Sequence, residues 1–200
     1  KMKKQKNIGL LFGTFNPPHI GHTLIANYFY ITNNFDEIWF IVSPQNPFKK
    51  DITLLNEKLR LEMVRLAIEN ANYLKASDIE FGLPKPSYTI NTLEKLKNDY
   101  PQYTFNIIMG SDNAISIEKW KYFQNIIDNH RIYVYPRTGY STKNILTHKN
   151  IKIDNTAPII DISSTWIREQ IKNGKDVQFF LRKVVYEFIK INGVYQGVGY

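Results

Sequence analysis

The sequence has 200 residues, with 26 lysines and arginines against 18 aspartates and glutamates, a formal net charge of +8, and no cysteine. The absence of cysteine excludes a disulfide scaffold, a thiolate nucleophile, a cysteine zinc site and an iron–sulfur cluster. Its length and 43% hydrophobic residues predict one globular domain over residues 1–200. The positive charge favours an anionic partner, and charge alone leaves open nucleic acid, a phosphate-rich metabolite or a membrane surface.

The first residues do not have the pattern of a targeting segment. Basic residues 1–6 precede an apolar run, Asn7 to Phe12, that is too short for a secretion signal. No window approaches the roughly 18 uninterrupted apolar residues that a membrane-spanning helix needs. We therefore expect a cytoplasmic protein that is not embedded in a membrane.

Short apolar runs alternate along the chain with longer segments of helical spacing. The first half predicts, in chain order, a strand at 7–12, a helix at 21–32, a strand at 37–43, a loop at 44–52 and a helix at 56–70. Both strands are apolar on both sides, which is typical of strands buried between two layers of helices.

The second half continues the alternation. It predicts a helix at 87–99, a strand at 104–109, a helix around 117–127, a strand at 131–135, a loop at 138–150, strands at 151–154 and 159–162, and helices at 165–173 and 177–191. Gly174 and Gly193 stand where the last two helices should end. The pattern indicates a doubly wound, mostly parallel, Rossmann-like α/β sheet with helices on both faces and a helical C-terminal portion over about 163–200.

The most informative segment, Gly13 to His22, lies between the first strand and the first helix. In an open parallel sheet this loop is at the carboxyl edge, where ligands bind. Gly13 allows close approach of the backbone to a ligand, and the spacing of His19 and His22 lets both imidazoles reach one point. Both can donate to a phosphate beside the positive end of the helix dipole. Two surface histidines or half of a metal site are the alternatives, and no nearby carboxylate completes a metal site.

This segment resembles the H-x-G-H signature of the nucleotidyltransferase superfamily, and its Phe-Asn-Pro-Pro form is similar to that of bacterial nicotinate-nucleotide adenylyltransferases. Further segments match that family in order and spacing: Pro47-Phe48-Lys49, Pro86-Ser87-Tyr88-Thr89, Met109-Gly110-Ser111-Asp112, Trp120, Tyr135-Pro136-Arg137 and Ile162 to Arg168. The resemblance spans residues 8 to about 190.

Two positions depart from the family pattern. The family often has glycine where Phe12 stands and histidine where Phe48 stands. Phe12 is compatible with the pattern if it packs beneath the loop, whereas Phe48 removes a polar contact.

Residues 163–168 are informative without the family. Ser163 or Ser164 is an ordinary helix N-cap. Arg168 is different, because a cation in the first turn opposes the helix dipole and indicates an anion supplied from outside; a solvated arginine is the alternative. The resemblance implies that this segment holds the phosphates of ATP opposite His19 and His22.

The resemblance also implies roles for residues that have ordinary structural explanations. Thr89 and Asp112 are plausible helix caps, Trp120 a packing residue, and Lys49 and Arg137 surface cations. The matching positions in the family assign these residues to the pocket for nicotinate mononucleotide: Asn16, Lys49, Thr89, Trp120 and Arg137. Trp120 would stack on the pyridine ring. ATP is assigned to Gly13, Thr14, Phe15, His19, His22, Gly110, Asp112, Ser163, Ser164 and Arg168, of which His19, His22 and Arg168 are expected to be catalytic.

The reaction that the resemblance implies joins nicotinate mononucleotide to ATP, giving deamido-NAD and pyrophosphate in NAD biosynthesis. The 5′-phosphate would attack the α-phosphorus in line, with no protein nucleophile and no protein metal site. Mg²⁺ is expected to enter with ATP, held mostly by phosphate oxygens and water.

Three other interpretations have different sequence signatures. A nucleic-acid binding module is disfavoured because no RNP, KH or helix-turn-helix pattern is present. A class I aminoacyl-tRNA synthetase would need more residues and a Lys-Met-Ser-Lys-Ser loop. A nicotinamide-preferring or dual-specificity enzyme, a pantetheine-phosphate adenylyltransferase or a cytidylyltransferase would share the histidine motif, although Ser87-Tyr88-Thr89 and Trp120 argue against the last two. The sequence does not decide whether the enzyme prefers the acid, nicotinate mononucleotide, or the amide, nicotinamide mononucleotide. It also leaves open whether the protein forms a homo-oligomer.

Overall fold

The computed structural model describes residues 5–44 and 54–197. Within these residues, six parallel strands form one sheet in the order β3-β2-β1-β4-β5-β6. The strands are β1 (Lys6–Gly13), β2 (Glu37–Val42), β3 (Leu74–Ser77), β4 (Tyr103–Gly110), β5 (Ile132–Tyr135) and β6 (Ile151–Ile153). The order reverses between β1 and β4, so the doubly wound sheet predicted from the sequence is confirmed.

Helices cover both faces because the side chains of a strand alternate between two apolar clusters. In β1, Leu11 belongs to the cluster beneath α1 (Ile20–Thr32) and α2 (Glu57–Ile68). Ile8 and Leu10 belong to the other cluster, beneath α3 (Thr89–Asp99) and α5 (Phe123–Asn129). The short helix α4 (Ser111–Ala114) follows β4 directly.

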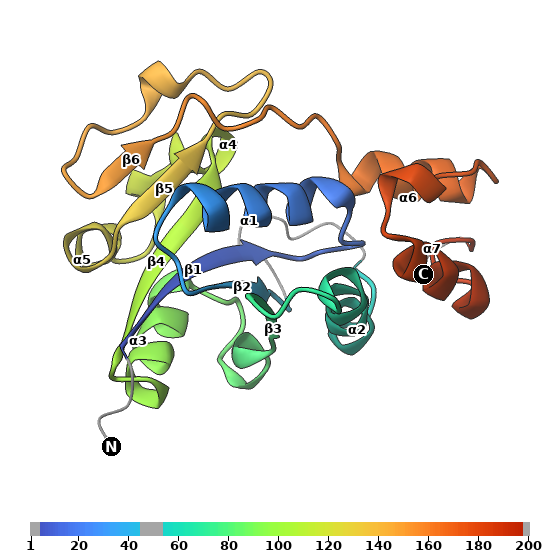
Figure 1. Cartoon of the computed structure of the whole chain (residues 1–200), viewed down its shortest axis with the longest axis horizontal. Coiled ribbons are helices and arrows are strands. Elements are labelled where there is room, and N and C mark those ends of the chain that lie inside the picture. The colour runs from blue at the N-terminus through green and yellow to red at the C-terminus, as the bar shows by residue number, and fades with distance from the viewer. Residues whose placement is uncertain (1–4, 45–53, 198–200) are drawn as a thin grey trace.

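The chain ends in two helices at the carboxyl edge of the sheet, α6 (Ser164–Lys172) and α7 (Lys183–Asn192) (Figure 1). Val185 and Ile189 of α7 are buried in the same apolar cluster as α2. Gly174 (φ +68°) and Gly193 (φ +61°) follow α6 and α7 in the left-handed region, as predicted for helix ends.

Three predicted elements are wrong in detail. Residues 159–162 are not a strand: Pro158 precedes them, and Ile160 packs against the start of α1 instead of pairing with the sheet edge. The predicted helix 117–127 is a 3₁₀ turn at Ile117–Lys119 and then α5, separated by Tyr122 in the left-handed region (φ +57°). The predicted helix 177–191 is likewise divided, because extended Leu181 separates a 3₁₀ turn from α7.

The sequence analysis also missed β3, which has four residues of which only Leu74 is buried. A short edge strand carries little apolar pattern. In the described part of the chain, we find no helix with the length and hydrophobicity to cross a bilayer.

Candidate active site

The site forms where β1 and β4 end side by side at the reversal of strand order, the usual ligand position in this type of sheet. Each strand ends in glycine, Gly13 and Gly110. A Cβ on Gly110 would lie 2.3 Å from an Asp112 carboxylate oxygen and 2.8 Å from Arg137 Cγ. Glycine is therefore needed at position 110 so that Asp112 and Arg137 can close over the strand end.

The two signature histidines form a stacked pair at the start of α1. Their ring centroids are 3.8 Å apart, and His19 is 5% exposed. The backbone N–H of His19 donates to His22 Nδ1 at 3.1 Å, and the His22 N–H donates to the His19 carbonyl oxygen at 3.0 Å. A Cβ on Gly21 would lie 2.9 Å from His19 Nδ1, so the glycine makes room for the stacked ring.

Both imidazoles are neutral at pH 7. Burial, with Arg137 nearby, lowers the pKa of His19 to about 3. Burial also lowers the pKa of His22 well below its ordinary value, helped by His19 and Arg137. Because Nδ1 of His22 accepts a hydrogen bond, Nε2 carries its proton and is the donor that remains for a ligand.

We predict that both histidines stay neutral in the folded protein as the pH falls from about 8 to about 5, whereas the chain unfolded in urea titrates near the ordinary value of about 6.5. Heteronuclear NMR of the imidazole nitrogens measures this and should show His22 protonated on Nε2. A midpoint near 6.5 for His19 or His22 in the folded protein would contradict the geometry.

The start of α6 is attached to the signature loop. Ser164 Oγ donates to the Pro17 carbonyl oxygen at 2.7 Å, and Arg168 Nη1 donates to the Asn16 carbonyl oxygen at 2.8 Å. Ser163 Oγ caps α6 by accepting from the Trp166 N–H at 3.1 Å. Arg168 is in the second turn of α6, not the first, and its place is explained by this contact with the loop. The predicted segment therefore does meet the loop that carries the histidines.

Arg137, at the end of β5, is on the histidine side of the site. Its positive charge lowers the pKa of both His19 and His22. Its backbone N–H donates to Ser111 Oγ at 2.9 Å, which fixes it to the start of α4. Arg137 is not among the residues that line the pocket around Trp120, although it lies against Gly110, which does line it.

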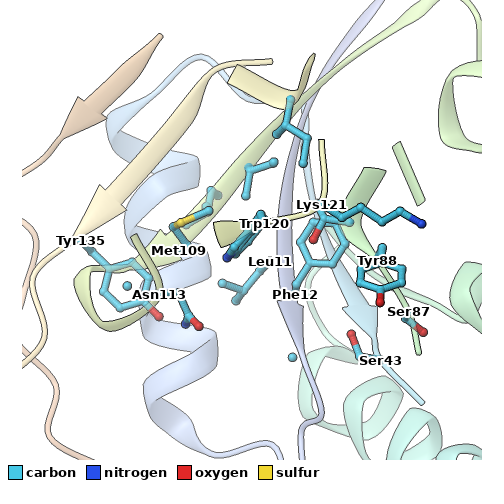
Figure 2. Close-up of a pocket in the computed structure, with 16 residues that line it drawn as sticks. Leu11, Phe12, Ser43, Ser87, Tyr88, Met109, Asn113, Trp120, Lys121 and Tyr135 are labelled. Carbon is cyan, nitrogen blue, oxygen red and sulfur yellow. The ribbon is translucent and has the colours of Figure 1, made fainter. Parts of the chain in front are cut away.

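A deep pocket lies on the other side of Gly13 and Gly110. Its lining combines apolar and aromatic side chains with a few polar groups, which is typical of small-molecule sites. Figure 2 shows the Trp120 ring at its centre, near Leu11 and Phe12. Thr89 lines the same pocket, so two residues predicted to bind one substrate are in one cavity.

The break in the helical segment 117–127 explains how Trp120 reaches the pocket. Trp120 follows the 3₁₀ turn in an extended conformation (φ −72°, ψ 142°), before left-handed Tyr122 starts α5. A continuous helix would direct this side chain differently. Lys121 Nζ lies 4.8 Å from the centre of the Tyr88 ring, so this segment and the start of α3 meet at the mouth of the pocket.

Comparisons with known proteins agree with this geometry. The family model described as cytidylyltransferase-like matches residues 10–170. A probable nicotinate-nucleotide adenylyltransferase of Flavobacterium psychrophilum is 49% identical over 94% of this chain and 98% of the relative. One of Bacteroides fragilis, also named as probable, is 45% identical over 94% of this chain and 92% of its own length.

The chain belongs to the nicotinate-nucleotide adenylyltransferase family. The Plasmodium falciparum nicotinic acid mononucleotide adenylyltransferase complexed with NaAD has the same fold, with a TM-score of 0.80 at 20% identity, covering 95% of this chain and 97% of that one. The family expectation from the sequence is thus confirmed, and the structure places every matching segment except Pro47-Phe48-Lys49, which lies outside the described residues.

Several predicted contacts need a different description in this member of the family. Asn16 is 1% exposed, and its Oδ1 accepts from the Tyr195 hydroxyl at 2.8 Å. Phe15 is 2% exposed and packs edge-on against His22, so only its backbone can meet a ligand. Phe12 lines the pocket instead of packing beneath the loop. Lys49 and Phe48 lie outside the described residues.

Some residues of the site were not identified from the sequence. Asn113 and Tyr135 both line the pocket, and burial raises the pKa of Tyr135 to about 12. Glu80 is 1% exposed behind the segment Ser87-Tyr88-Thr89 and accepts from the Thr92 hydroxyl at 2.7 Å, and burial raises its pKa. Nothing in the sequence around Glu80, a single glutamate near two prolines, predicts that its side chain is buried.

The donor set of the described residues does not form a protein-held metal site. Across residues 5–44 and 54–197, no three histidine, aspartate or glutamate side chains gather to hold an ion. The neutral His19 and His22 with the cations Arg137 and Arg168 suit phosphate oxygens instead.

Proposed function

We propose that this protein transfers the adenylyl group of ATP to nicotinate mononucleotide, giving deamido-NAD and pyrophosphate in NAD biosynthesis. The observation that carries the proposal is the pair of adjoining subsites at the ends of β1 and β4. One presents histidines and arginines, and the other is an aromatic pocket around Trp120. Relatives named for this activity match over nearly the whole chain, which supports the same assignment.

In this reaction an oxygen of the mononucleotide 5′-phosphate attacks the α-phosphorus of ATP. The new P–O bond forms as the bond to the bridging oxygen of the β-phosphate breaks, and pyrophosphate leaves with that electron pair. The attacking group belongs to the substrate, so the protein contributes positioning and charge stabilisation.

Each side chain has a defined task. His22 donates from Nε2, with His19 stacked beside it, to oxygens on the phosphorus under attack. Arg137 and Arg168 bind the negative charge of the departing pyrophosphate, and Asp112 accepts from a ribose hydroxyl. Ser163 and Ser164 hold the start of α6 in place, since both hydroxyls have partners in the protein.

Mg²⁺ enters as the complex with ATP and neutralises phosphate charge. A cation held by phosphate oxygens and water needs no protein cage. A cytoplasmic location stays a prediction from the sequence.

A parallel assay of pyrophosphate release tests the substrate. We expect Mg²⁺-ATP to turn over with nicotinate mononucleotide, and not with phosphopantetheine or without an acceptor. Equal rates with nicotinamide mononucleotide would make the enzyme dual-specific. Turnover with neither pyridine nucleotide would refute the proposal.

His22→Asn isolates the proposed donor. Asparagine Oδ1 can replace Nδ1 as the acceptor from the His19 N–H, while the donor at Nε2 is lost. We expect kcat to fall by about 10²-fold, the usual effect of losing one preorganised donor, with little change in the melting temperature. Retention of most of the wild-type kcat would refute the role of His22; His22→Ala serves as the comparison in which the helix cap is lost as well.

Trp120→Ala should change KM for the two substrates by different amounts. Loss of a stacking platform should raise KM for nicotinate mononucleotide by about 10-fold or more, while KM for ATP changes much less. Trp120→Phe is the matched control and should restore most of the affinity. Equal losses for both substrates would show that Trp120 only packs.

A further inference from the structure

Arg60, near the start of α2, is a fully buried arginine that the reaction does not use. Its relative exposure is 0%, and it is among the largest fully buried side chains. A buried cation is costly unless its charge and its donors are satisfied. Among the ion pairs of the described residues, none includes Arg60. Its partners must therefore be neutral acceptors.

Those acceptors are four backbone carbonyl oxygens. Nε donates to Leu55 at 2.8 Å and Nη2 to Pro44 at 3.1 Å. Nη1 donates to both Ser43 at 2.8 Å and Thr14 at 2.6 Å. The guanidinium thus joins the loop after β1 to the end of β2 and to the start of α2. Among side chains, only the planar guanidinium group of arginine has enough N–H donors in fixed directions to bind all four carbonyls.

The bond to Thr14 fixes the peptide between Thr14 and Phe15. In a planar trans peptide the carbonyl and the following N–H point in opposite directions. The Phe15 N–H therefore faces away from Arg60. In the part of the chain that the structure describes, this N–H donates to no protein group.

Phe15, which follows this peptide bond, is in the left-handed region (φ +47°). A residue other than glycine keeps this strained conformation only when neighbouring groups hold it there. The buried Phe15 ring lies edge-on to His22, with centroids 5.0 Å apart. A continuous path of contacts therefore runs from Arg60 through Thr14 and Phe15 to His22.

We propose that Arg60 is a positioning residue. It holds the Thr14–Phe15 peptide so that the Phe15 N–H donates to a phosphate oxygen of the bound nucleotides and the Phe15 ring supports His22. This inference rests on the proposed function for the identity of the anion. It predicts that loss of the guanidinium impairs the chemical step beyond any loss of stability.

Arg60→Lys tests the proposal, with Ile68→Ala as the matched control. Ile68 is a buried residue at the far end of α2, so its loss weakens the same helix without touching the loop. At a temperature where both variants are folded, we expect Arg60→Lys to lower kcat by about 10- to 100-fold, the effect of misplacing a reacting group. KM for nicotinate mononucleotide should change little. A kcat within threefold of wild type, or an equal fall in Ile68→Ala, would overturn the proposal.

A second measurement needs no turnover. In wild-type protein, the backbone amide resonance of Phe15 should shift strongly when an ATP analogue with an α,β-methylene bridge and nicotinate mononucleotide are added, and this shift should be lost in Arg60→Lys. An unresponsive Phe15 amide in wild type would overturn the proposal. If wild type released no pyrophosphate, the proposed function would fail, and the amide response to the phosphate compounds would decide the role of Arg60 by itself.

Discussion

Hydrogen bonds to the carbonyl groups of the loop between β1 and α1 hold this site together. Arg60 of α2 binds the Thr14 carbonyl, and Arg168 and Ser164 of α6 bind those of Asn16 and Pro17. Pro17 and Pro18 have no N–H, and the bond from Arg60 to the Thr14 carbonyl leaves the Phe15 N–H facing away from α2. The fold therefore prepares a loop in which protein groups bind the carbonyls of Thr14, Asn16 and Pro17.

The position of the loop divides the site into two parts with different chemistry. On one side, burial keeps the histidine pair neutral beside Arg137, so donors for phosphate are present without a cluster of repelling cations. On the other side, the aromatic lining of the pocket around Trp120 is suited to a flat ring. At the strand ends, a Cβ on Gly13 would clash with the Phe15 ring and one on Gly110 with Asp112 and Arg137, so both glycines are needed for this packing. This division suits a reaction in which two substrates meet at one phosphorus atom.

The sequence predicted the parts of this account that depend on local pattern. Strands such as β1 and β2 are continuous apolar runs, and the histidine motif lies where such a strand meets a helix, so both were recognisable. Long-range contacts left no such signal. Arg60 stands at the helical spacing of the buried face of α2, but its charge gives no sign of burial, and its partners are carbonyls 5 to 46 positions away. The division of residues 117–127 at Tyr122 and the interior place of Asn16 depend on tertiary packing in the same way.

We expect the phosphates of one nucleotide to bind at the histidine pair and the ring of the other to bind at Trp120, across the ends of β1 and β4. A crystal structure with nicotinate mononucleotide and an α,β-methylene analogue of ATP tests this directly. We expect this arrangement: the α-phosphate at His22 Nε2, a phosphate oxygen at the Phe15 N–H, and the pyridine ring on Trp120. A triphosphate bound away from the histidines, or a pyridine ring outside the Trp120 pocket, would contradict it.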